Sequence, residues 1–171
     1  MLRCATPLVA LLVTTACDSD PTDPGIPRAD LQGVYDFTIL SFDPQGSLPE
    51  VDIRARLGAE FEPTLNLIST GSAQLVYQDA QTGAVETVPG TFTTGSTTVT
   101  ITFTEGTPFH RVLLSRSMTF QWNATARTLT FADTAPDGVD LTRLRELVPE
   151  WEDEPLSDPV PGELTIVFTH R

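Results

Sequence analysis

From residue 31 onward, apolar and polar residues alternate with a period of two, which is typical of half-buried β-strands. The clearest example is 98–104, where Val99, Ile101 and Phe103 alternate with threonines. A weaker segment, 84–93, contains Pro89 and Gly90, which indicate a bend or bulge. Together the patterns predict about eight strands. The remaining segments are 34–42 (with Tyr35, Phe37 and Ile39 on one face), 61–67, 73–78, 117–122, 127–132 and 163–169.

Short connections between these segments favour an antiparallel meander over a fold with long crossovers. The first strand begins near Gly33 and the last ends near Arg171, so the two ends of the sheet could pair and close an all-β, eight-stranded up-and-down barrel. A two-sheet β-sandwich is the alternative, because its inward pattern is the same. One short helix is predicted over 140–148, with Asp140 as its N-cap and Pro149 after its end.

An eight-stranded barrel is just wide enough either to be filled by side chains or to hold one small ligand. The inward positions of the predicted strands are therefore the candidate ligand-lining residues. They are Tyr35, Phe37, Leu65, Leu67, Tyr77, Val99, Ile101, Phe103, Met118, Phe120, Trp122, Leu129, Phe131, Leu164, Ile166 and Phe168. The tyrosine hydroxyls, with Arg111 or Arg116, are the candidate polar groups that would orient such a ligand.

The segment 31–37 (LQGVYDF) resembles the opening of lipocalin-like, or calycin-type, barrels, in which a Gly-x-Trp element begins the first strand. Tyr35 stands where that family has Trp. The resemblance implies that this aromatic ring packs across the closed end of the barrel, under an arginine from the last strand. Arg171 is the candidate for that arginine.

The N-terminal residues have the pattern of a secretory signal peptide over 1–16. Arg3 precedes an apolar run over 5–13, which is too short to span a bilayer, and small residues follow at 14–16. Residues 13–17 (VTTAC) resemble a bacterial lipoprotein signal, although Thr14 stands where Leu is usual. The resemblance implies that Cys17 is diacylated, by palmitate or similar chains, and becomes the mature N-terminus. An ordinary signal peptide followed by an unmodified Cys17 is the alternative.

Residues 17–30 are predicted to be the lipidated cysteine and a flexible tether, because 18–30 is rich in proline and aspartate and has Ile26 as its single large apolar residue. The domain would then be 31–171. We expect the acyl chains to hold it on a membrane of the bacterial cell envelope, with the domain in the periplasm or on the cell surface. Whether that membrane is the inner or the outer one stays open.

The composition limits the chemistry that the chain can perform. The formal charge is −13 and all ten basic residues are arginines, which excludes a catalytic lysine and argues against nucleic-acid binding. Two cysteines and two histidines, His110 and His170, show no metal-ligand spacing, so we expect no metal and no cofactor. No Gly-x-Ser-x-Gly element occurs, and we expect no enzymatic activity.

The acidic run 150–154 (EWEDE) is expected to be a solvated loop. Trp151 within it should either pack down onto the domain or face a protein partner of unknown identity, which makes it the candidate partner-loop residue. The first hypothesis for function is an envelope lipoprotein whose lipocalin-like barrel binds a small apolar or amphipathic molecule. The alternative is a structural or interaction module of the envelope with a filled core and no ligand.

Overall fold

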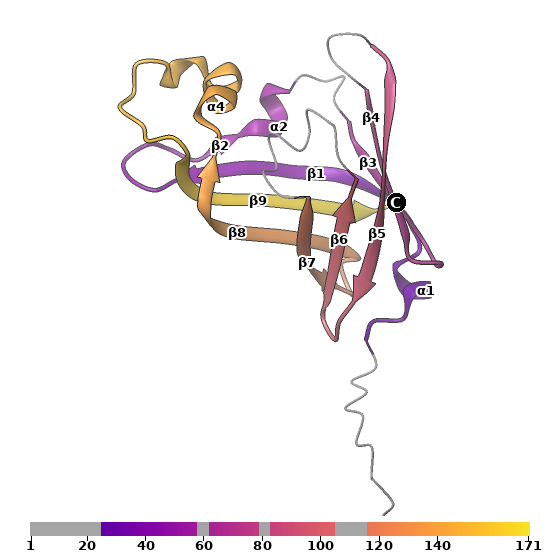
Figure 1. Ribbon diagram of the computed structural model, residues 1–171. Helices are drawn as coiled ribbons and strands as arrows, with labels where there is room; N and C mark the ends of the chain where they lie inside the picture. Colours follow the sequence, from indigo (N-terminus) through magenta and orange to yellow (C-terminus); the bar gives the residue numbers. More distant parts are fainter. Residues whose placement is uncertain (1–24, 58–61, 79–82, 105–115) are drawn as a thin grey trace, which may run out of the picture.

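The sheet of this protein closes on itself. The computed structural model describes residues 25–57, 62–78, 83–104 and 116–171, with the backbone alone at 133–138 and 143. Strand β9 at the C-terminus pairs with β8 and also returns to pair with β1, so β1 and β3 to β9 form a closed antiparallel ring (Figure 1). This pairing confirms the predicted eight-stranded barrel and rules out the sandwich.

The strands follow one another around the ring in chain order, as predicted for a meander. A short additional strand, β2, pairs with the distal part of β1. The strands are β1 (Gly33–Pro44), β2 (Val51–Asp52), β3 (Thr64–Ile68), β4 (Ser72–Gln78), β5 (Val85–Thr94), β6 (Thr98–Phe103), β7 (Ser117–Asn123), β8 (Thr128–Val139) and β9 (Val160–His170). The helices are α1 (Arg28–Leu31), α2 (Ile53–Arg56), α4 (Leu141–Leu147) and the 3-10 helix η1 (Pro149–Trp151).

Threonines on the outer face of the barrel pair with hydroxyls across neighbouring strands. The Oγ1 atoms of Thr100 and Thr119 lie 2.9 Å apart, and those of Thr38 and Thr169 lie 3.0 Å apart. Such cross-strand pairs stabilise a sheet while leaving its outer face compatible with water. The alternation of threonine with large apolar residues therefore corresponds to outward and inward positions, as the sequence predicts.

One strand departs from simple alternation. The pairing of β1 with β9 shifts by one residue between Phe37 and Ile39, which is the mark of a β-bulge. As a result Ile39 points outward and is 45% exposed, whereas Leu40 is fully buried. The prediction that Ile39 shares the inward face of Tyr35 and Phe37 is wrong, because the bulge reverses the facing of every later residue of β1.

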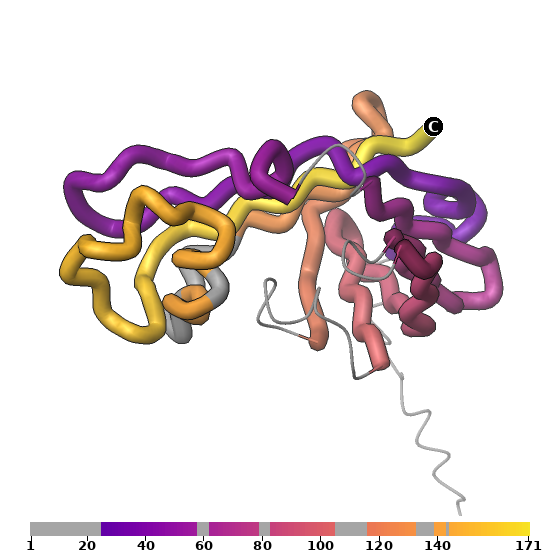
Figure 2. Tube along the Cα trace, turned by 90° about the horizontal axis from the view of Figure 1, so that it is seen from above, coloured from indigo at the N-terminus to yellow at the C-terminus, as the bar shows by residue number. Residues whose placement is uncertain are grey.

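Three strands are longer than the barrel requires. β1, β8 and β9 run side by side beyond the ring (Figures 1 and 2), and β8 reaches Val139, seven residues past its predicted end at Ala132. We call the part of the molecule at their far end the lobe: it comprises the distal halves of these strands with β2, α2, α4 and η1. Its buried side chains include Phe42, Ile53, Val139, Leu144, Val148, Trp151 and Val160.

The helix α4 confirms the predicted helix, and the carbonyl oxygen of Asp140 accepts its first hydrogen bond from Leu144 N at 3.0 Å. Pro149 ends the helix and begins η1. Phe61, an inward residue of the predicted second strand, lies outside the described residues.

The folded domain includes residues that the sequence assigns to the tether. Ile26 is buried, and its N–H donates to the carbonyl of Gly95 at 2.8 Å. Leu31, at the end of α1, has no exposed surface. The prediction that the domain begins at Leu31 is therefore a few residues too late, because a single apolar residue between prolines is enough to fix this segment against the end of the barrel.

Candidate ligand site in the barrel

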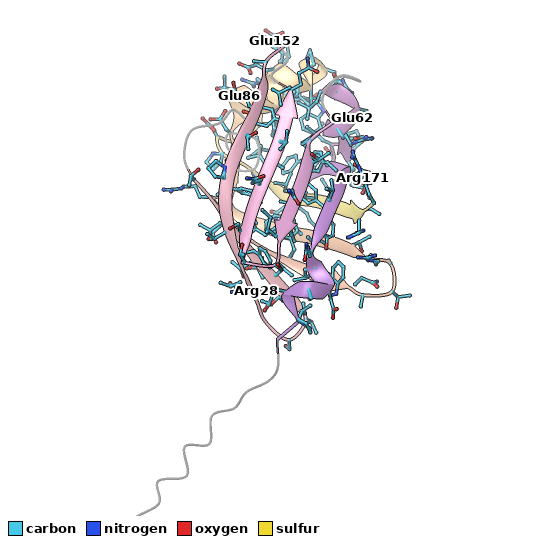
Figure 3. The ribbon with its side chains drawn as sticks, turned by 90° about the vertical axis from the view of Figure 1, so that its right-hand side faces the viewer. Arg28, Glu62, Glu86, Glu152 and Arg171 are labelled. Carbon is cyan, nitrogen blue, oxygen red and sulfur yellow. The ribbon has the colours of Figure 1, made fainter. Side chains whose placement is uncertain are left out.

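The two ends of the barrel differ in how they are filled. We call the end at which α1 packs the closed end; β1 begins there and β9 ends there. The mouth is the opposite end, where β4 and β6 end and β7 begins. In Figure 3 Arg28 of α1 lies at one extreme of the molecule and Glu86, at the start of β5, lies towards the other.

Tyr35 is the central residue of the closed end. Its ring is fully buried, and its hydroxyl donates to the carbonyl oxygen of Leu31 at 2.7 Å, which ties β1 to α1. The ring of Trp122 packs edge-on against it, with centroids 6.3 Å apart. Burial raises the pKa of Tyr35 to about 12, and the positive charge of Arg127 opposes part of that rise. The resemblance to lipocalin-like barrels correctly anticipated an aromatic ring across this end.

The arginine nearest to this ring is Arg127 and not Arg171. A guanidinium nitrogen of Arg127, in the turn between β7 and β8, donates to His170 Nε2 at 2.8 Å, and the imidazole lies edge-on to Tyr35. Because guanidinium groups only donate, Nε2 must accept, and Nδ1 then donates to the carbonyl oxygen of Arg171 at 2.5 Å. The side chain of Arg171 instead pairs with Asp36, with 2.7 Å between Nε and Oδ1.

A continuous row of rings lines one wall of the barrel, on the neighbouring strands β1, β9, β8 and β7. The centroids of Phe37 and Phe168 lie 5.1 Å apart, those of Phe168 and Phe120 lie 5.8 Å apart, and those of Phe120 and Phe131 also lie 5.8 Å apart. These spacings are those of directly packed aromatic pairs. The row therefore forms a packed aromatic surface on this wall of the interior.

Among the buried inward side chains of the barrel, those towards the mouth retain the most exposed surface, and the partly buried Trp122 at the closed end is the exception. Leu65, Leu67 and Leu129, near the closed end, are fully buried. Closer to the mouth, Tyr77 is 4% exposed and Phe131 is 9% exposed. A side chain that borders a space large enough for water keeps some accessible surface, so among the buried inward residues Phe131 and Tyr77, at the mouth, are the candidates to border a ligand space.

All of the predicted ligand-lining residues except Trp122 are buried, and Trp122 is partly buried at the closed end. Their ligand contacts remain a prediction. The structure brings Phe37, Tyr77, Phe103, Met118 and Phe131 towards the mouth, and we call these five side chains the mouth residues. Leu164 lies in the distal part of β9, where it pairs with Phe42 of the lobe.

Sequence reasoning missed Phe92, which is buried in β5. The guanidinium carbon of Arg28 lies over its ring, 5.9 Å from the ring centroid. Its inward position follows from the two-residue alternation that begins at Val88, but Pro89 and Gly90 obscured it. Of the polar candidates, Arg116 is exposed before β7, and Arg111 and His110 lie outside the described residues.

Trp151 does not face a partner. It is 3% exposed and belongs to the buried cluster of the lobe, so the prediction that it presents its indole to a protein is wrong and the packed alternative holds. Its backbone carbonyl accepts from Arg145 Nε at 3.4 Å. The acids around it stay at the surface, where Glu150 pairs with Arg56 of α2, which lowers the pKa of the carboxyl group.

Across the described ranges, no three His, Cys, Asp or Glu side chains gather into a group that could hold a metal ion. The helices within the same ranges are all too short or too polar to cross a bilayer.

The topology is that of an eight-stranded, antiparallel, lipocalin-like barrel. No protein-family profile, curated protein or solved structure matches this chain.

Proposed function

We propose that this protein is a lipid-anchored protein of the bacterial cell envelope whose barrel binds a small apolar or amphipathic molecule at its mouth. The anchor would be the acylated Cys17, and binding would involve no catalytic step. The resemblance of residues 13–17 to a lipoprotein signal supports the anchor, and the barrel fold is compatible with ligand binding.

The observation that carries the binding proposal is the residual exposure of the buried inward side chains, which is largest at Phe131 and Tyr77 near the mouth. Tyr35 at the closed end has no exposed surface, whereas Phe131 and Tyr77 near the mouth keep some. Mouth residues of this kind, aromatic rings with one methionine, supply the apolar and adaptable surface that small-molecule sites use. The hydroxyl of Tyr35 donates to Leu31 at the closed end, and Tyr77 is the tyrosine among the mouth residues.

The packed ring row supports a second candidate, an envelope interaction module with a filled core. Phe37 and Phe131 are members of both the row and the mouth residues, so a ligand could bind only above them. In this candidate the mouth residues would pack on one another and the protein would take up no small molecule.

The experiment that separates the two candidates uses the full-length protein purified from membranes. Organic extraction followed by mass spectrometry should find one small molecule in stoichiometric amount. Fatty acids and retinoids, titrated onto protein that has not been extracted, should then displace this molecule. No extracted molecule and no saturable uptake from the panel would favour the filled module.

A further inference from the structure

The N-terminal segment of the fold enters at the closed end of the barrel. Ile26 N donates to Gly95 O in the turn between β5 and β6, and Arg28 Nη1 donates to the carbonyl oxygen of Thr70 in the turn between β3 and β4. Seven residues separate Cys17 from Gly25. Fully extended at about 3.1 Å per residue, they span roughly 22 Å, so the closed end must stay near any membrane that holds Cys17.

The charges of the described side chains are separated along the same direction. Arg28, Arg127 and Arg171 lie at the closed end with Asp30 and Asp36 as the described acids there, and Asp36 is paired with Arg171. Glu62 lies near Arg171, whereas most of the other described acids lie at the mouth end or in the lobe, among them Glu86 and Glu152 (Figure 3). Four described arginines lie among these acids, at positions 54, 56, 116 and 145, and Arg56 is paired with Glu150. Among the described side chains, the closed end is therefore close to neutral, whereas the rest of the described protein is strongly acidic.

The separation is large enough for the two ends to act independently on a charged surface. Strand β9 alone runs from the lobe to the closed end over 11 residues, which is roughly 35 Å at about 3.3 Å per residue. Electrostatic forces between exposed charges fade over about 8 Å at physiological ionic strength. Anionic headgroups near the closed end would therefore interact with its arginines and with the acids close to them, which include Asp18, Asp20 and Asp23 of the connecting segment, and only weakly with the distant acids.

From these two observations we infer that the closed end faces the membrane, with Arg28 and Arg127 against anionic phospholipid headgroups, and that the mouth and the lobe point away from it. The inference rests on the proposed Cys17 anchor. It assigns the lipid surface as the partner of the closed end, and it places ligand exchange on the aqueous side, away from the anchoring bilayer.

The two tryptophans make the orientation measurable, because Trp122 lies near the closed end and Trp151 lies in the lobe. The chain beginning at Cys17 carries a single thiol. It can be coupled through that thiol to a maleimide lipid in vesicles of phosphatidylcholine and phosphatidylglycerol that contain a dansyl lipid. Energy transfer to the dansyl group is then compared between Trp151→Phe, which keeps Trp122, and Trp122→Phe, which keeps Trp151.

Transfer should be several-fold stronger from Trp122 than from Trp151. Equal transfer, or stronger transfer from Trp151, would overturn the inference. A control chain with Cys17→Ser and Glu152→Cys is attached through the lobe, and the order of the two tryptophans should reverse. If the order of energy transfer were unchanged in this control, it would not depend on the attachment point, and the inference would be overturned as well.

The lipid contact is tested by Arg28→Gln combined with Arg127→Gln. In vesicles with phosphatidylglycerol, this pair of substitutions should reduce the difference in energy transfer between Trp122 and Trp151. In pure phosphatidylcholine that difference should stay unchanged. Arg56→Gln, in the lobe, is the matched control and should change neither. An undiminished difference in the double variant would refute the headgroup contact. Because the coupling is chemical, these results do not depend on natural acylation, which mass spectrometry of the native N-terminus tests separately.

Discussion

The imidazole of His170 lies edge-on to the phenol ring of Tyr35, with ring centroids 4.9 Å apart. The residue before the C-terminus and the third residue of the first strand are thus in contact at the closed end. Tyr35 and His170 also face each other in the strand register of β1 and β9. The ring closure of the barrel and its plugged end are therefore made by the same pair.

The raised pKa of Tyr35 predicts a loss of stability at alkaline pH. In the unfolded chain this phenol ionises near pH 10.0, whereas in the folded protein it stays neutral up to a pKa of about 12. Between these values the unfolded state binds fewer protons, so the free energy of unfolding falls as pH rises, by up to about 3 kcal/mol. Urea unfolding at a series of pH values measures this slope.

Tyr35→Phe is the control for that slope. It should remove the part of the alkaline loss that is due to this residue. At neutral pH it should destabilise the protein by about 1 kcal/mol, because the carbonyl of Leu31 loses its donor. An identical pH profile in the variant would show that other groups cause the loss.

Gly33→Ala should destabilise the closed end. An added Cβ would overlap the imidazole of His170, and the backbone φ of 148° disfavours any residue with a side chain. Gly46→Ala is the matched control, because Gly46 has a similar φ of 134° but no atom within 4 Å of the added Cβ. We expect both variants to lose about 1 kcal/mol from the backbone term and Gly33→Ala to lose clearly more. Equal losses in thermal unfolding would contradict the predicted overlap.

Phe131→Leu should weaken binding at the mouth. Phe131 is the most exposed of the buried inward side chains at 9%, and replacing its ring removes apolar contact surface from a ligand above it. We expect roughly tenfold weaker binding of a fluorescent fatty acid, measured by titration. Val85→Ala is the control, because Val85 is an apolar residue of the same end that is 71% exposed. Similar affinities for both variants would place the ligand elsewhere.

Cys17→Ser should release the protein from the membrane or leave it unprocessed, because the predicted acyl acceptor is lost. Cell fractionation and mass spectrometry of the N-terminus measure the outcome. Cys4→Ser, within the predicted signal peptide, should leave anchoring unchanged. A processed Cys17→Ser protein in the membrane fraction would mean that another feature holds it there.

Much of the barrel follows from the two-residue alternation, because each strand buries one face against a common interior. Sequence reasoning failed where apolar residues are adjacent or isolated. Ile39 and Leu40 are consecutive, so the pattern cannot say which of them turns inward after the bulge. Ile26 is a lone apolar residue, and its burial depends on the turn at Gly95, which the sequence does not place beside it.

For the candidate site, the sequence predicted which side chains point into the barrel, but it did not predict at which end of the barrel a ligand would bind. Alternation identifies inward residues but does not say where along the barrel the packing ends. That limit depends on how the rings of Phe37, Phe120, Phe131 and Phe168 pack on one another. These rings come from four different strands, so their packing is fixed only in the folded structure. Likewise, Arg127 reaches His170 from a turn in which its own φ is 53°, a conformation that no periodic pattern signals.

Because β1, β8 and β9 run through both the barrel and the lobe, the two parts share three strands. Melting the lobe would fray the strands whose near halves close the ring, and opening the ring would release the strands on which the lobe packs. The barrel and the lobe should thus unfold in one cooperative transition. A destabilising substitution near Trp151 should therefore also lower the melting temperature of the closed end.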